Sequence, residues 1–78
     1  MQIRCESVAP GAVPSEAVVA IKTSEGHAEE VVVHTSLVEG DKVRVSGLAR
    51  REKTVLIQLP RESVQGNWRL WVPDAIVA

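Results

Sequence analysis

Valine is the commonest apolar residue of this chain, whereas phenylalanine and tyrosine are absent and two tryptophans supply all of its aromatic side chains. Valine is restricted at its first side-chain torsion and packs well on a pleated surface. Apolar runs bounded by glycine, proline and other turn residues are typical of strands. The sequence therefore predicts an all-β fold.

The chain has 78 residues, which is the length of one domain, and we expect residues 1–78 to form a single small β-barrel. A core of this size supplies only about 3–5 kcal/mol of net stability. The single cysteine, Cys5, cannot form an internal disulfide, and no set of cysteines and histidines has the composition of a metal site. We therefore expect a fold that depends on its apolar core, helped by oligomerisation, with no metal and no cofactor.

No apolar run approaches the roughly 20 residues of a membrane span. The first residues lack the charged and apolar regions of a secretory signal. A lone cysteine fits a reducing compartment. We expect a cytoplasmic protein with no membrane partner.

Six segments have the pattern of strands. In the first, Ile3 and Cys5 share one face, which predicts that Cys5 fills the core. A helix over residues 15–22 competes with the second segment, but its apolar residues do not recur at helical spacing, so we expect a strand. The expected strands are residues 2–8, 17–23, 30–35, 42–45, 54–59 and 68–72, with connections at 9–15 and 24–28, a basic loop or hairpin tip at 47–53, and a turn at 60–67.

The two halves of the chain differ in charge. Residues 1–39 carry two basic and six acidic residues, a net charge of −4, whereas residues 40–78 carry seven basic and four acidic residues, a net charge of +3. Either the halves attract each other within one barrel, or the second half presents a basic face to an anionic partner.

Two segments of the second half carry a family resemblance. The first is Leu37-x-x-Gly40-Asp41-Lys42-Val43-x-Val45, and the second is Trp71-Val72-Pro73-x-x-x-Val77. Together, over residues 37–78, they resemble the Src-homology-3 (SH3) barrel and especially its bacterial relatives. In that family the Gly-Asp turn begins the second strand, and the closing aromatic-apolar-Pro segment enters a 3₁₀ turn. The resemblance implies a small SH3-like β-barrel of five to six antiparallel strands with an N-terminal strand or hairpin extension; an OB-fold is the alternative.

Peptide-binding members of that family grip a polyproline helix in an aromatic groove. Here only Trp71 and Pro73 keep the character of the groove, because Val19 and Ile21 occupy the first-strand positions and Ile76 replaces a groove tyrosine. The resemblance therefore implies the fold but not polyproline recognition.

The two tryptophans are separated by the period of two residues along a strand. Trp68 shares a face with Leu70 and Val72, which predicts that Trp68 packs in the core or at its edge. Arg69 and Trp71 then lie on the opposite face. An outward tryptophan beside an arginine has the composition of an interface hot spot. In the alternative interpretation, Trp71 covers a barrel end or packs under the N-terminal strand.

Two functions from different classes fit these features. The first is a non-enzymatic module for protein–protein interaction or homo-oligomerisation, in which Trp71, Arg69, Pro73 and open strand edges meet another chain. The second is nucleic-acid binding, with Trp71 as a stacking platform. The basic face for that second function contains Arg44, Arg50, Arg51, Lys53, Arg61 and Arg69. The net charge of −1 and the single outward aromatic favour a protein partner or self-association.

No catalytic residue is expected. The sequence contains no Gly-rich phosphate loop, no His-Glu-x-x-His motif and no nucleophile elbow. The acidic residues Glu29, Glu30 and Asp41 have the positions of solvated strand ends and turns. His27 is expected at a solvated loop tip and His34 on an exterior face. A site shared between subunits is the catalytic alternative that the sequence leaves open.

Overall fold

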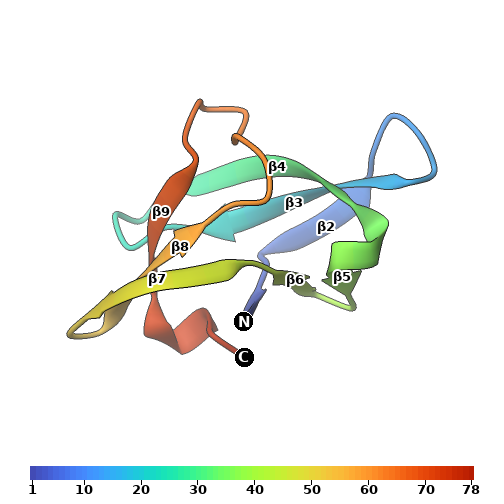
Figure 1. Ribbon diagram of the computed structural model, residues 1–78. Helices are drawn as coiled ribbons and strands as arrows, with labels where there is room; N and C mark the ends of the chain where they lie inside the picture. The colour runs from blue at the N-terminus through green and yellow to red at the C-terminus, as the bar shows by residue number, and fades with distance from the viewer.

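A computed structural model describes residues 1–78 and shows an all-β chain without an α-helix (Figure 1). The nine short strands are β1 (Gln2–Arg4), β2 (Ser7–Pro10), β3 (Glu16–Lys22), β4 (Ala28–His34), β5 (Val38–Glu39), β6 (Lys42–Arg44), β7 (Ser46–Arg51), β8 (Thr54–Gln58) and β9 (Arg69–Pro73). Two 3₁₀ turns, Thr35–Leu37 and Asp74–Ile76, complete the chain. None of these elements is a helix long and apolar enough to cross a membrane.

The strands form three antiparallel sheets of three strands each. Their strand orders are β1-β6-β5, β2-β3-β4 and β7-β8-β9. The all-β class is confirmed, but none of the three sheets closes on itself. The SH3-like barrel and its OB alternative therefore stay predictions, and the chain is divided into more and shorter strands than the five to six expected.

One apolar core joins the three sheets. It contains thirteen buried residues, and its fully buried members include Ile3 from β1, Val19 from β3, Val43 from β6 and Ile57 from β8. Inward residues alternate with outward ones along β3, β4, β8 and β9, as the period of a strand requires. Each sheet has only one apolar face, and this face is buried because it packs against the apolar faces of the other sheets.

The expected first strand, residues 2–8, is wrong as a single element. It breaks between Cys5 and Glu6, because the Cys5 amide donates to the Asp41 carbonyl while the Glu6 amide donates to the Ala20 carbonyl. The chain thus changes sheets at this point. The connection expected at residues 9–15 also begins later, since β2 runs through Pro10, and proline is tolerated in an edge strand.

Most of the other strand predictions are confirmed. The competing helix over residues 15–22 does not form, because β3 pairs along its whole length with β4. The loop or hairpin tip expected at residues 47–53 is wrong over most of its length, because residues up to Arg51 belong to strand β7, which pairs with β8. Only residues 52 and 53 form the turn of this hairpin. β8 also pairs with β9, as the apolar runs on either side of the Gly-Asn turn predicted.

Trp68 is not a core residue. Its side chain is 52% exposed, and β9 begins only at Arg69. The alternation that buries Leu70 and Val72 therefore does not extend to Trp68. Trp68 is the last residue of the loop that follows β8, and its carbonyl accepts a hydrogen bond from the Leu59 amide.

Two local features that the resemblance implied are present. Gly40, in the turn between β5 and β6, has a φ of 63°, which glycine adopts without strain. The 3₁₀ turn Asp74–Ile76 follows Pro73 directly, and Val77 then forms an antiparallel bridge with Ile3 of β1. The C-terminal segment is thereby held against the N-terminal strand.

Shortening a central core side chain should cost most of the stability of so small a domain. We expect Ile57→Ala to lower the free energy of unfolding by about 2–5 kcal/mol, because Ile57 is fully buried and its truncation leaves a cavity. The matched control is Val64→Ala, at a residue that is 67% exposed, with an effect within about 0.5 kcal/mol. Urea unfolding followed by tryptophan fluorescence measures both; equal effects would contradict the assigned core.

Candidate functional site

The clearest candidate site is the face of the β7-β8-β9 sheet that points away from the core. Val55 and Ile57 on β8 and Leu70 and Val72 on β9 are buried on the opposite face. Strand register places Leu56 opposite Trp71, Gln58 opposite Arg69, and Thr54 between Arg51 and Pro73. We call this the outer face, and its residues are Arg51, Thr54, Leu56, Gln58, Arg69, Trp71 and Pro73.

Trp71 lies at the centre of the outer face. It points outward as predicted, but it is half-buried because the Arg51 guanidinium carbon lies over its ring, 5.1 Å from the ring centroid. This is the geometry of a cation–π contact, in which the negative face of the ring attracts the cation. Leu56, directly across on β8, extends the apolar centre. The ring is therefore not an uncovered stacking platform.

Arg69 marks the other end of the outer face. Its Nε donates a 3.0 Å hydrogen bond to Oε1 of Gln58, the residue opposite it on β8. This bond uses one donor of the exposed guanidinium, and the two terminal amino groups have no hydrogen-bond partner in the chain. Neither Arg51 nor Arg69 takes part in an ion pair, since the ion pairs of the structure involve other residues. The outer face thus carries two positive charges without a counter-charge.

β9 is anchored on two sides, so the outer face is positioned rigidly. Leu70 and Val72 fill the core beneath it, and the Trp71 carbonyl accepts a 2.8 Å hydrogen bond from the Ser24 amide of the β3–β4 turn. A site on strands fixed by packing holds its side chains more precisely than one on a loop. The arrangement suits recognition of an extended, partly apolar and acidic segment.

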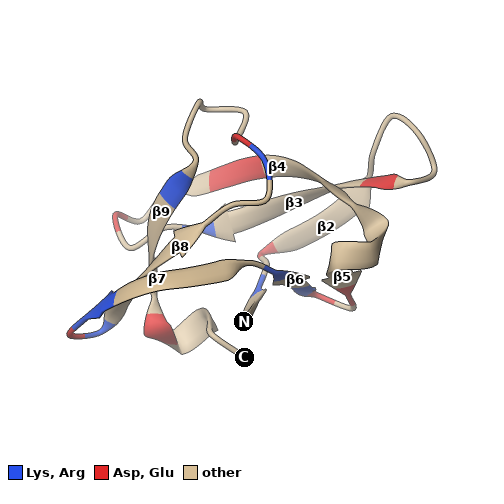
Figure 2. Cartoon of the chain, in the orientation of Figure 1, with Lys and Arg blue, Asp and Glu red and all other residues tan.

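The remaining basic residues proposed from the sequence do not gather into one face. Figure 2 shows Lys and Arg separated over the molecule, with groups at the tip of the β7–β8 hairpin and near β6. Arg50 pairs with Asp74 at 3.9 Å, and Arg61 pairs with Glu16 at 3.8 Å. Arg44 belongs to β6, in a different sheet, and Lys53 lies in the β7–β8 turn. Of the proposed binding residues, the structure brings together Arg51, Arg69, Trp71 and Pro73.

A second cluster surrounds Glu29, which the sequence placed wrongly at a solvated strand end. Glu29 is only 3% exposed, and three side chains make four polar contacts with its carboxylate. Asn67 Nδ2 lies 3.0 and 2.9 Å from its two carboxylate oxygens, Ser63 Oγ donates at 2.7 Å, and His27 Nε2 lies at 3.0 Å. Because Ser63 and Asn67 belong to the long β8–β9 loop, the carboxylate fastens this loop to β4.

The hydrogen bonds also determine the charge state of Glu29. Burial alone would raise its pKa, but the hydrogen bonds from His27, Asn67 and Ser63, with the charge of His27, outweigh burial and lower the pKa below its ordinary value. Glu29 is therefore ionised at neutral pH. Its carboxylate is saturated by side chains of this chain, which is the arrangement of a structural latch.

The histidines were placed correctly, but their contacts could not be read from the sequence. His27 is exposed at the β3–β4 turn and contacts Glu29, and its Nδ1 lies 3.3 Å from Thr23 Oγ1. His34 is exposed, and its Nδ1 accepts from the Ser36 amide at the start of a 3₁₀ turn. Cys5 fills the core as predicted, and burial, together with the charge of Asp41, raises the pKa of its thiol to about 11.

Two parts of the candidate site were missed, although a signal for each exists. Glu29 is two residues before Val31, so extending the inward alternation of β4 by one step predicts that it points into the protein. Gln58 is polar, as is Thr54 at the other end of β8, and these two residues identify the side of the strand that Leu56 also faces. The partners of Glu29 had no signal, because Ser63 and Asn67 are more than thirty residues away.

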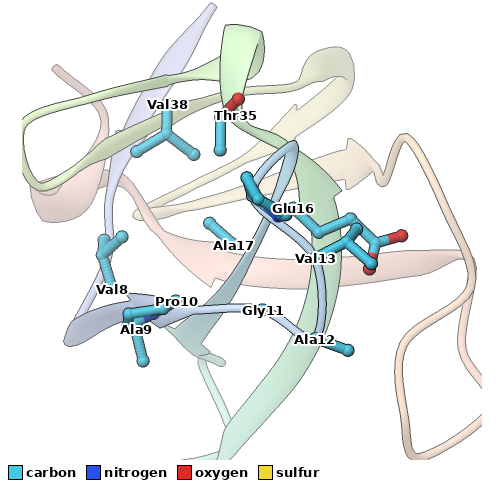
Figure 3. Close-up of a pocket in the computed structure, with 11 residues that line it drawn as sticks. Val8, Ala9, Pro10, Gly11, Ala12, Val13, Glu16, Ala17, Thr35 and Val38 are labelled. Carbon is cyan, nitrogen blue, oxygen red and sulfur yellow. The ribbon is translucent and has the colours of Figure 1, made fainter.

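An apolar hollow of about 710 Å³ lies between β2 and β5, each of which is the edge strand of its sheet (Figure 3). Val8 and Pro10 of β2 form one side, and Val38 of β5 faces them, with Ala17 between. Glu16 is the one charged residue of its lining. The volume is that of a ligand site, but the hollow lies open at the surface and contains no aromatic side chain.

Comparison of the chain with protein-family models, curated proteins and solved structures found no match.

The Glu29 latch should make stability depend on pH in the acidic range. Because the folded pKa of Glu29 lies below its unfolded value of about 4.3, its stabilisation is complete above that pH and is lost as the pH falls through the folded pKa. We expect Glu29→Gln to cost about 1–3 kcal/mol at pH 7 and to flatten the loss of stability below about pH 4. Denaturant unfolding at several pH values measures this effect.

The control for the latch is Glu30→Gln, at the adjacent exposed residue. It should leave both the stability at pH 7 and the acid profile close to those of the parent protein, within about 0.5 kcal/mol. Identical profiles for the Glu29 and Glu30 variants would show that the buried carboxylate does not hold the loop.

Proposed function

We propose that this domain is a non-enzymatic binding module that takes an acidic segment of a protein partner on the outer face of the β7-β8-β9 sheet. The observation that carries the proposal is the pair of guanidiniums, Arg51 and Arg69, which flank the half-buried Trp71 without any ion pair. A guanidinium offers several donors in a planar fork that matches a carboxylate. Trp71 and Leu56 supply apolar contact between the two charges.

A protein partner is favoured over a nucleic acid by the geometry of the aromatic residues. Single-stranded nucleic acids are held by successive bases stacked on exposed aromatic rings along a basic groove. Here the Trp71 ring is covered by Arg51, and the exposed Trp68 lies in the loop before β9, outside the outer face. The basic residues are also divided among separate regions (Figure 2). Nucleic-acid binding by Trp71 and the basic residues is the second candidate.

For the finer fold and the location we propose an SH3-like barrel in a cytoplasmic protein. The fold proposal is supported by the Gly40 turn, the 3₁₀ turn Asp74–Ile76 and the bridge from Val77 to Ile3. The location is supported by a single buried thiol that requires no oxidising compartment.

Binding can be tested by amide NMR with three probes: a short peptide of alternating glutamate and leucine, a peptide of alternating lysine and leucine, and a single-stranded oligonucleotide. We expect the acidic peptide to shift the amides of Arg51, Leu56, Arg69 and Trp71, and the basic peptide to shift none of them. Arg69→Gln should weaken binding of the acidic peptide about 10- to 100-fold, since it removes one charge-assisted contact worth about 1.5–3 kcal/mol.

Arg44→Gln is the matched control, because it removes one positive charge from a different sheet and should leave binding of the acidic peptide within about twofold. Equal weakening by both variants would mean that net charge, rather than the outer face, attracts the peptide. If the oligonucleotide alone shifts the outer face, the nucleic-acid function replaces the proposed one.

A further inference from the structure

Two strands of this fold, β2 and β7, are exposed at every residue. Each is also the edge of its sheet, since the orders are β2-β3-β4 and β7-β8-β9. An edge strand presents unpaired backbone donors and acceptors that can pair with another chain. The other edges are shorter, or are partly occupied, as β9 is by the Ser24 amide.

The two edges differ in charge. The exposed Glu6 precedes β2, and Glu16 lies next to it at the start of β3. β7 ends with Arg50 and Arg51, and Glu52 and Lys53 follow in the turn, so this end of the edge carries three positive charges and one negative charge. The edge at β2 is therefore acidic and the edge at β7 is basic.

Glu16 and Arg50 are in ion pairs within the chain, but Glu6, Arg51 and Lys53 are not. The sequence left open whether the acidic first half and the basic second half attract each other inside one molecule. Only one ion pair joins the halves, between Arg61 and Glu16 at 3.8 Å. The other two pairs, His27–Glu29 and Arg50–Asp74, each lie within one half. Glu6, Arg51 and Lys53 remain free to attract charges of another molecule.

We propose that copies of this chain associate head to tail, with β2 of one copy pairing along β7 of the next. Strand addition of this kind provides affinity through main-chain hydrogen bonds and specificity through the side chains beside them. The opposite charges of the two edges favour this pairing, and they disfavour β2 against β2 or β7 against β7, which would bring like charges together.

Apolar groups accompany the charges at both edges. Leu48 is the one large apolar side chain of β7, is 46% exposed, and lies at the irregular register between Gly47 and Ala49. On the other edge, Val8 of β2 is exposed beside the apolar hollow (Figure 3). Pairing β7 against β2 places Leu48 and Val8 in one interface, so apolar groups are buried together with the strand edges.

The association is heterologous, because two different surfaces meet. Such a contact leaves a free β2 at one end and a free β7 at the other, and it continues until the copies close into a ring or form an open chain. Pro10 at the end of β2 lacks a backbone donor and limits the pairing to a short segment. The inference shares Arg51 with the outer face but not Arg69 or Trp71. Its test changes neither Arg51 nor the other residues of the outer face, so self-association and peptide binding can fail separately.

Sedimentation velocity of the purified chain tests the proposal. At about 0.1 M salt the average mass should rise with protein concentration above the 8.5 kDa of one copy. At about 1 M salt the average mass should return toward that of one copy, because the Debye length falls from about 10 Å to about 3 Å.

Two double variants each reverse the charge of one edge. Arg50→Glu with Lys53→Glu makes the β7 edge acidic, and Glu6→Lys with Ser7→Lys makes the β2 edge basic.

Each variant alone has two edges of like charge and should be monomeric, with self-association at least about 10-fold weaker than in the parent protein. An equimolar mixture should associate again, because each variant then offers the charge that the other lacks. Circular dichroism confirms that both variants are folded before they are mixed. A parent chain that stays monomeric at low salt, or folded variants that do not associate on mixing, would overturn the proposal.

Discussion

Everything in this fold depends on burying three small sheets against one another. No sheet of three short strands can cover its own apolar face, so the thirteen core residues come from all three sheets and from the chain that links them. The core consists mainly of valine, isoleucine and leucine, with no aromatic side chain among its members. Stiff β-branched side chains lose little freedom on packing, which helps a domain whose core is small. The sheets are consequently joined by side-chain contact more than by shared hydrogen bonds.

This constraint explains which features could be predicted from the sequence. Alternation along a strand is a local property, so the inward residues of β3, β8 and the end of β9 follow from the order of residues alone. The point at which a strand changes its partner is not local. Cys5 and Glu6 are neighbours in the chain, but the Cys5 amide bonds to Asp41 in the β5–β6 turn and the Glu6 amide to Ala20 of β3, in another sheet. Nothing between residues 2 and 8 marks that change. The single strand expected there therefore became two.

The features of the candidate site also divide into those that a local pattern predicts and those that depend on distant residues. Trp71 and Arg69 were predicted to face outward because Leu70 and Val72 face inward, and this relation is local. Trp68 was placed in the core by extending the same alternation beyond the first residue of β9, where the loop releases the chain from the sheet. Arg51 over the Trp71 ring could not be predicted, because the contact spans the full width of the sheet through β8. Side-chain neighbours across strands require the register, which only the folded chain determines.

The buried Glu29 shows how a loop with little apolar burial is held in place. After Leu59, which is in the core, the segment that leads to β9 has exposed side chains at most positions, including Val64 and Trp68, so apolar burial contributes little to its position. Instead, Ser63 and Asn67 reach one carboxylate on β4, and the Val64 amide bonds to the Glu30 carbonyl beside it. A buried charge is costly unless its hydrogen bonds are complete, and here completion requires the loop to be closed. The free-energy cost of burying Glu29 thus makes the loop conformation specific. The closed loop then lies in a fixed position beside the outer face of β8 and β9.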